Sequence, residues 1–149
     1  MELVIRPFEG MGPIDFNMSR DTIVATLGQP SDEISPIKWR YRDSDLFVSF
    51  DDAGLCDYVE ADYAKNTFVV RGLRLSGDYD QVVKLLKAAG YSLVPGNEQT
   101  ADDQTTYCPD LGILLWRLDE TGDPLTLIGA WRRGLWDPYP FGPKSNMQQ

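Results

Sequence analysis

Two short helical segments, each with its own start and stop signals, constrain the fold of this chain more than any other feature. Ser19 is placed to cap the first helix, and Gly28 followed by Pro30 predicts where that helix ends. Residues 76–78, Ser-Gly-Asp, form a second capping cluster, and Gly90 predicts the end of the next helix. Each segment carries one apolar stripe, so each helix needs one partner surface against which to pack.

Segments with the alternation or the composition of β-strands surround these helices. They lie at residues 2–6, 37–41, 46–50, 55–61, 68–75, 91–94, 104–108, 112–117 and 125–132. Each half of the chain therefore has the order strand, helix and meander, which predicts an internal structural repeat. We expect one α+β domain over residues 1–149: an antiparallel sheet built from two helix-plus-meander halves, about 1–65 and 66–135, with the short helices packed on one face and a C-terminal tail at 136–149.

The charge balance limits the kind of partner that the chain can have. The 149 residues include 14 basic and 23 acidic side chains, which gives a formal net charge of -9. Such a surface repels nucleic acid and anionic membranes, so neither is an expected partner. It steers a basic protein toward the chain, although acidity can also serve solubility alone.

The chain is expected to act in the cytoplasm. Its first residues do not form a signal peptide, and no apolar run approaches the length of a membrane span. Cys56 and Cys108 lie far apart within apolar, strand-like segments. We interpret them as buried free thiols in a reducing compartment, with a disulfide as the alternative.

Side chains suited to catalysis are scarce. The chain has no histidine, which removes the usual general base and the usual ligand of transition metals. Two scattered cysteines are too few for a structural zinc site, and neither a phosphate loop nor a dinucleotide fingerprint is present. We therefore expect no enzyme activity, no cofactor and no metal. A carboxylate-dependent hydrolase or a small-ligand binder stays as an alternative, built from clustered acids.

The acids gather in two stretches, residues 43–62 and 98–123. The first holds seven acids and no lysine or arginine. A solvated sheet edge or a partner-binding patch both account for such stretches. Aromatic residues gather toward the C-terminus, where they form either core or binding anchors. The candidate partner-binding residues are Asp43, Asp45, Asp51, Asp52, Asp57, Asp102, Asp103, Asp119, Glu120, Trp116, Trp136 and Tyr139.

Residues 10–30, GMGPIDFNMSRDTIVATLGQP, resemble a pattern of small bacterial proteins: G-x-G-P-I-x-F-G-M-S, a short helix, then L-G-x-P. Residues 110–113 and 128–137 are similar to the second half of that group. Asn17 replaces the usual glycine, and asparagine also tolerates positive φ. The group resembles single-domain immunity proteins of contact-dependent or polymorphic toxin systems. The helix-plus-meander order is also similar to β-lactamase inhibitor proteins and to small outer-membrane assembly lipoproteins, whose lipobox cysteine this chain lacks.

The resemblance implies an immunity protein that neutralises a cognate bacterial toxin, expected to be a basic effector domain, by direct binding through an acidic surface with aromatic anchors. It carries over no residue-level site. The alternatives are the hydrolase or small-ligand binder and a structural scaffold without a toxin.

Overall fold

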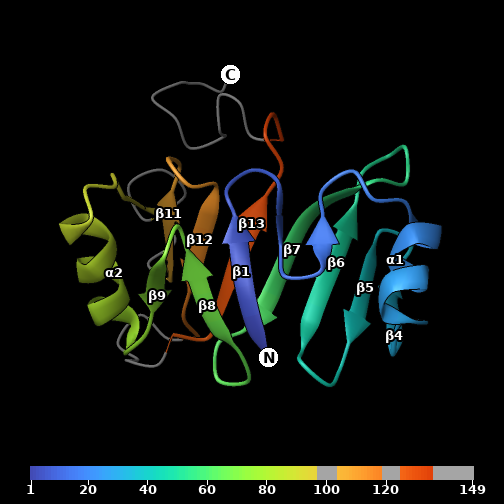
Figure 1. Cartoon of the computed structure of the whole chain (residues 1–149), viewed down its shortest axis with the longest axis horizontal. Coiled ribbons are helices and arrows are strands. Elements are labelled where there is room, and N and C mark those ends of the chain that lie inside the picture. Colours follow the sequence, from blue (N-terminus) through green and yellow to red (C-terminus); the bar gives the residue numbers. More distant parts are fainter. Residues whose placement is uncertain (97–103, 119–124, 136–149) are drawn as a thin grey trace.

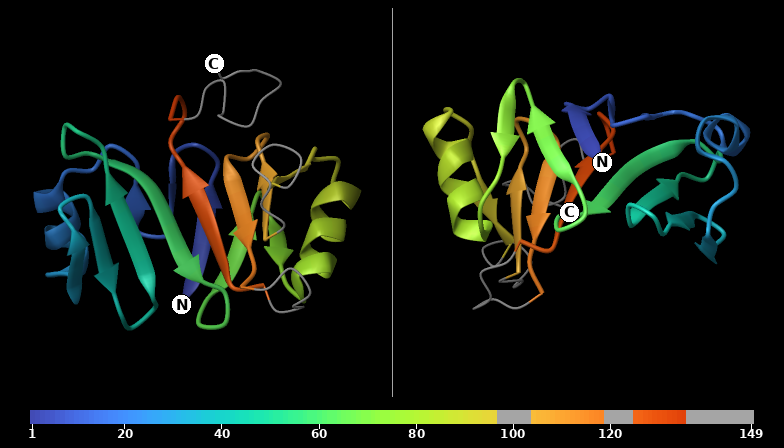
Figure 2. Two further views of the ribbon diagram at one scale, coloured as in Figure 1. Left: turned by 180° about the vertical axis from the view of Figure 1, so that it is seen from behind. Right: turned by 60° about the horizontal axis from the view of Figure 1, so that its bottom comes forward.

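The computed structural model describes residues 1–96, 104–118 and 125–135, whose strands form two sheets packed against each other (Figure 1). The small sheet has the strand order β3-β2-β1-β8-β9, and the large sheet has the order β10-β11-β12-β13-β7-β6-β5-β4. Helices α1 (Arg20–Leu27) and α2 (Tyr79–Ala88) flank the small sheet on the same side of the large sheet (Figure 2). The α+β class expected from the sequence is confirmed.

The small sheet is joined at its centre by a parallel pair of strands from distant parts of the chain. β1 pairs with β8 so that Leu3 lies beside Phe68 and Ile5 beside Val70. All four side chains are buried, because alternate residues of each strand point toward the large sheet. The strands of this sheet are β1 (Glu2–Arg6), β2 (Gly10–Met11), β3 (Ile14–Asp15), β8 (Thr67–Val70) and β9 (Leu73–Leu75).

The large sheet is antiparallel at each of its pairings, and β7 and β13 meet at its centre. It therefore places the four strands that follow α1 beside the four that follow α2. Its strands are β4 (Asp32–Ser35), β5 (Lys38–Tyr41), β6 (Leu46–Phe50), β7 (Cys56–Asp62), β10 (Val94–Pro95), β11 (Thr105–Cys108), β12 (Ile113–Trp116) and β13 (Leu127–Trp131).

The helix boundaries follow from local capping. The Ser19 side chain accepts a hydrogen bond from the backbone N–H of Thr22, and Gly28 ends α1 with φ at 84°. Asp78 and Gln81 form a reciprocal capping box at the start of α2. No helix among the described residues is long or apolar enough to cross a membrane.

The main core fills the space between the two sheets and the two helices. It includes Ile23 of α1, Val82 and Leu86 of α2, and the inward residues of both sheets. Cys56 and Cys108 belong to this core as buried free thiols, as expected. Burial raises the pKa of each thiol to about 12, so both stay protonated and weakly nucleophilic at neutral pH.

The structure differs from the sequence-based expectation in the number and length of its strands. The single strand expected over residues 68–75 is a hairpin, because Arg71 and Gly72 turn the chain at positive φ. The short strands β2, β3 and β4 were not expected, and two sheets replace the single sheet. Asn17 takes a φ of 75°, so asparagine adopts the positive φ that was expected to be tolerated at this position.

Candidate functional site

The large sheet has an inner face, which packs on the small sheet and helices, and an outer face on the opposite side. The left view of Figure 2 looks onto this outer face, with the large sheet in front. Directly paired residues of neighbouring strands share a face, so the register assigns every outward side chain. The outer face carries Asp32, Lys38, Arg40, Phe47, Ser49, Tyr58, Glu60, Asp62, Val94, Thr105, Tyr107, Leu114, Trp116, Leu127, Gly129 and Trp131.

The part of the outer face formed by β11, β12 and β13 is apolar and aromatic. Tyr107, Leu114 and Trp131 are buried there and form a second cluster, separate from the main core. Trp116 and Leu127 pack against it and are half-buried. An apolar layer on the outside of a sheet, with partly exposed large side chains, is typical of a contact surface.

This aromatic layer contains a hollow of about 380 Å³, which we call the aromatic hollow. Its walls come from β7, β11, β12 and β13. The residues that line it are Tyr58, Glu60, Thr105, Tyr107, Leu114, Trp116 and Leu127. The aromatic hollow therefore combines three aromatic rings with one carboxylate.

Gly129 makes room for the Tyr58 side chain, which forms part of the aromatic hollow. In the register, Gly129 lies between Leu114 of β12 and Glu60 of β7, so one row of outward side chains is interrupted. Tyr58 leans over the vacant position: a Cβ added to Gly129 would lie 2.0 Å from the Tyr58 hydroxyl oxygen. Glycine is required here by this close approach.

Glu60 gives the aromatic hollow a negative charge. Its side chain is 16% exposed, and the ammonium of Lys38 lies 4.0 Å from its carboxylate. Burial raises the pKa of Tyr58 well above its usual value, and the charge of Glu60 and a hydrogen bond to it add to the effect. The Tyr58 hydroxyl therefore stays protonated and donates to the Glu60 carboxylate.

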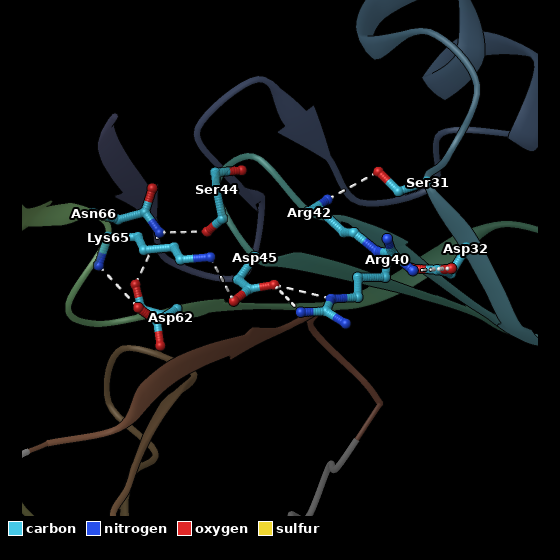
Figure 3. A network of polar contacts seen from close by, with 9 residues as sticks. All are labelled: Ser31, Asp32, Arg40, Arg42, Ser44, Asp45, Asp62, Lys65 and Asn66. Atoms are coloured by element: carbon cyan, nitrogen blue, oxygen red, sulfur yellow. Dashed lines mark hydrogen bonds and ion pairs between the residues drawn. The ribbon is translucent and has the colours of Figure 1, made fainter.

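The acids on the other side of the outer face are paired with basic residues of the chain itself. Arg40 and Lys65 both contact the Asp45 carboxylate, with Lys65 Nζ at 3.0 Å (Figure 3). Burial raises the pKa of Asp45, but the hydrogen bonds from Arg40 and Lys65 outweigh it and lower the pKa overall. Arg42 and Asp32 form a two-point ion pair of 2.8 and 2.9 Å at the edge strand.

A second internal ion pair joins the turn after β6 to the end of β13. Arg132 donates to the Asp51 carboxylate at 2.8 Å and to the Asn17 side chain at 2.9 Å. The hydrogen bond from Arg132 lowers the pKa of Asp51, and backbone N–H donors from Leu55 and Ala53 act in the same direction. Asp51 therefore serves chiefly to hold the turn after β6 against the end of β13.

The structure distributes the predicted acidic residues rather than bringing them together. Asp43 and Asp52 are exposed, but they lie in turns at opposite ends of β6. Asp57 is half-buried beside β13, and burial raises its pKa despite the opposing charge of Arg132. Trp116 lines the aromatic hollow. Asp102, Asp103, Asp119, Glu120, Trp136 and Tyr139 lie outside the described residues.

Sequence reasoning missed most of the aromatic hollow. Tyr58 and Glu60 alternate with buried residues in β7, which was a usable signal for a shared outward face. Tyr107 and Leu114 lie in runs that are buried throughout, so alternation gave no sign of which way they point.

A smaller hollow of about 170 Å³ lies nearby and includes Asp45 and Asp62 in its lining. Within residues 1–96, 104–118 and 125–135, no group of three or more His, Cys, Asp or Glu side chains is arranged to hold a metal ion. No protein-family model matches the chain, and the comparisons with curated proteins and with solved structures find no match either.

Proposed function

We propose that this chain is an immunity protein that neutralises a basic protein toxin by binding it through the outer face of the large sheet. The observation that carries the proposal is the aromatic hollow, in which Tyr58, Tyr107 and Trp116 surround one carboxylate. Aromatic side chains in such positions anchor protein interfaces, because they contribute a large contact area at low conformational cost.

The position of the aromatic hollow supports binding to a large partner. The helices and the small sheet pack on the opposite face of the large sheet, so the outer face is the side that we assign to contact with a large partner (Figure 2). Strands β7, β11, β12 and β13 supply a rigid floor, which limits the entropy lost on binding.

The charge distribution supports a basic partner. The formal net charge of -9 raises the rate at which a cationic domain meets the surface. Asp45 and Asp51 contribute little local charge, because each is paired with an internal cation. Glu60 and the exposed acids Asp43 and Asp52 are the better candidates for contact with the toxin.

We also propose that the fold consists of two helix-plus-meander repeats and that the protein acts in the cytoplasm. The strand order supports the repeat, since each helix is followed by four strands of the large sheet, and the last strand of each set, β7 or β13, pairs with the other. Free buried cysteines fit a reducing compartment.

The test is coexpression with the product of the gene adjacent to the one that encodes this chain. That product should arrest growth when expressed alone, and coexpression should restore growth and give a stable complex on size-exclusion chromatography. Trp116→Ala should weaken the complex tenfold or more. Ile37→Ala is the matched control, because Ile37 is a 53% exposed apolar residue outside the aromatic hollow. Absence of both protection and complex would refute the proposal.

Small-ligand binding is a second candidate, and the volume of about 380 Å³ and the mostly apolar lining of the aromatic hollow favour it. Hydrolysis by paired carboxylates has less support. Of the two acids in the smaller hollow, Asp45 has a lowered pKa and stays ionised at neutral pH, so it is a poor general acid.

A further inference from the structure

The aromatic hollow has the chemistry of a cation site. Electron-rich ring faces attract cations, and the attraction grows when water is excluded. Glu60 adds a full negative charge beside the rings Tyr58 and Tyr107, which line the same space. A neutral apolar group would fill the volume but would offer the carboxylate nothing beyond its contacts with Lys38 and the Tyr58 hydroxyl, whereas a cation adds a favourable charge interaction.

The internal cation nearest to Glu60 does not fill this site. Lys38 lies on β5, and its ammonium is 5.0 Å from the ring of Phe47 on β6. It therefore approaches Glu60 from the β6 side at 4.0 Å, whereas the aromatic hollow extends from Glu60 toward β13 and β12. Glu60 also lines the hollow, next to the Tyr58 hydroxyl that donates to it.

We propose that the aromatic hollow receives an arginine side chain of the toxin, with the guanidinium paired to Glu60 and stacked on the surrounding rings. This inference rests on the proposed function and names the anchor of its complex. Arginine fits better than lysine, because its planar group stacks on aromatic faces and presents paired N–H donors to a carboxylate.

Gly129 is the positioning residue for this anchor. It lets Tyr58 lie close over the sheet, and any side chain at this position would displace the Tyr58 ring from its place in the wall of the hollow. Gly129→Ala should therefore weaken arginine binding even though alanine adds no charge and removes no contact group.

The experiment titrates the full chain with Nα-acetylarginine amide while the indole N–H signal of Trp116 is followed by NMR. Saturable shifts at Trp116 are expected, whereas the neutral isostere Nα-acetylcitrulline amide should give none. Glu60→Gln should lower the affinity about tenfold or more. Glu33→Gln is the matched control, since it removes the same charge from an exposed position on β4 and should leave binding unchanged.

Equal binding of the citrulline and arginine amides, or unchanged affinity in Glu60→Gln, would overturn the inference. Tighter binding of tetramethylammonium than of the arginine amide would also overturn it and would assign the hollow to a small quaternary ammonium compound. If Glu60→Gln leaves the affinity for the toxin unchanged, the arginine anchor is refuted but the proposed function still stands. Arginine binding without any toxin complex would remove the proposed function instead.

Discussion

The two sides of the outer face differ in the contacts that their side chains make. On the side formed by β4, β5 and β6, the charged residues find partners within the chain, as in the pairs Asp32–Arg42 and Asp45–Arg40. On the side formed by β11, β12 and β13, large apolar side chains pack into a layer that surrounds a hollow. On the first side the charges are paired within the chain, and on the second side aromatic rings and a carboxylate line a hollow.

This difference shows that a cluster of acids in a sequence is a weak guide to the charge that a surface presents, because the acids can be paired within the chain. The acidic stretch at 43–62 is the more conspicuous feature, yet Asp45 and Asp51 in it are held by cations from elsewhere in the chain. Glu60, with an ion pair to Lys38 at 4.0 Å, is the acid of that stretch that lines the aromatic hollow.

Replacing Trp131 should give the largest effect on stability. Trp131 is 2% exposed, so Trp131→Ala is expected to cost about 3–5 kcal/mol of unfolding free energy. Phe47→Ala, on the charged side, should cost about 1 kcal/mol, because Phe47 is half-buried. Urea denaturation of the two variants measures the contrast, and equal losses would show that the aromatic side is no more tightly packed than the charged side.

Breaking the Arg132 joint should have the next largest effect. Arg132→Met removes two hydrogen bonds that tie Asp51 and Asn17 to the end of β13, and it should lower Tm by several degrees. Arg42→Met breaks a pair whose arginine side chain is 63% exposed, so little change in Tm is expected. Thermal unfolding followed by circular dichroism tests this ranking. A larger loss of Tm in Arg42→Met than in Arg132→Met would contradict it.

Acid should destabilise the protein through the paired aspartates. Asp45 and Asp51 have lowered pKa values in the folded state, so their contribution is full above the ordinary aspartate pKa of about 3.9 and is lost as the pH falls through the lower folded values. Asp57 affects stability in the opposite direction. Its pKa is raised in the folded state, so its ionisation with rising pH opposes folding.

Thermal unfolding between pH 7 and pH 3 checks these signs. Asp45→Asn should lower Tm at pH 7 and flatten its fall below pH 4, whereas Asp57→Asn should raise Tm at neutral pH. Parallel curves for wild type and Asp45→Asn would show that the Arg40 and Lys65 contacts do not contribute to stability.

Local signals made the helices predictable, whereas nonlocal pairing made the candidate site unpredictable. Ser19, Gly28 and Asp78 act on backbone groups within four residues, so their roles can be read directly. The aromatic hollow depends on Gly129 lying between Glu60 and Leu114, which requires the register of β13 with both of its neighbours. The pairing of Asp45 with Lys65 could not be predicted for the same reason, since Lys65 lies 20 positions away.

The smallest effects are expected at Asp43 and Asp52, the exposed acids of the turns on either side of β6. Asp43→Asn and Asp52→Asn should each change stability by no more than about 0.5 kcal/mol. If the aromatic hollow is the contact, each change removes one charge at the rim, so the association rate with a basic toxin should fall a few-fold and only at low salt.

Glu60→Gln should act differently from these rim variants, because a charge inside the contact affects how long the complex lasts. We expect faster dissociation for Glu60→Gln and unchanged dissociation for Asp43→Asn and Asp52→Asn in stopped-flow and surface-binding measurements. Faster dissociation of the Asp43 or Asp52 variant would move the contact from the aromatic hollow to the end of the sheet where that turn lies, because the turns are separated by the whole length of β6.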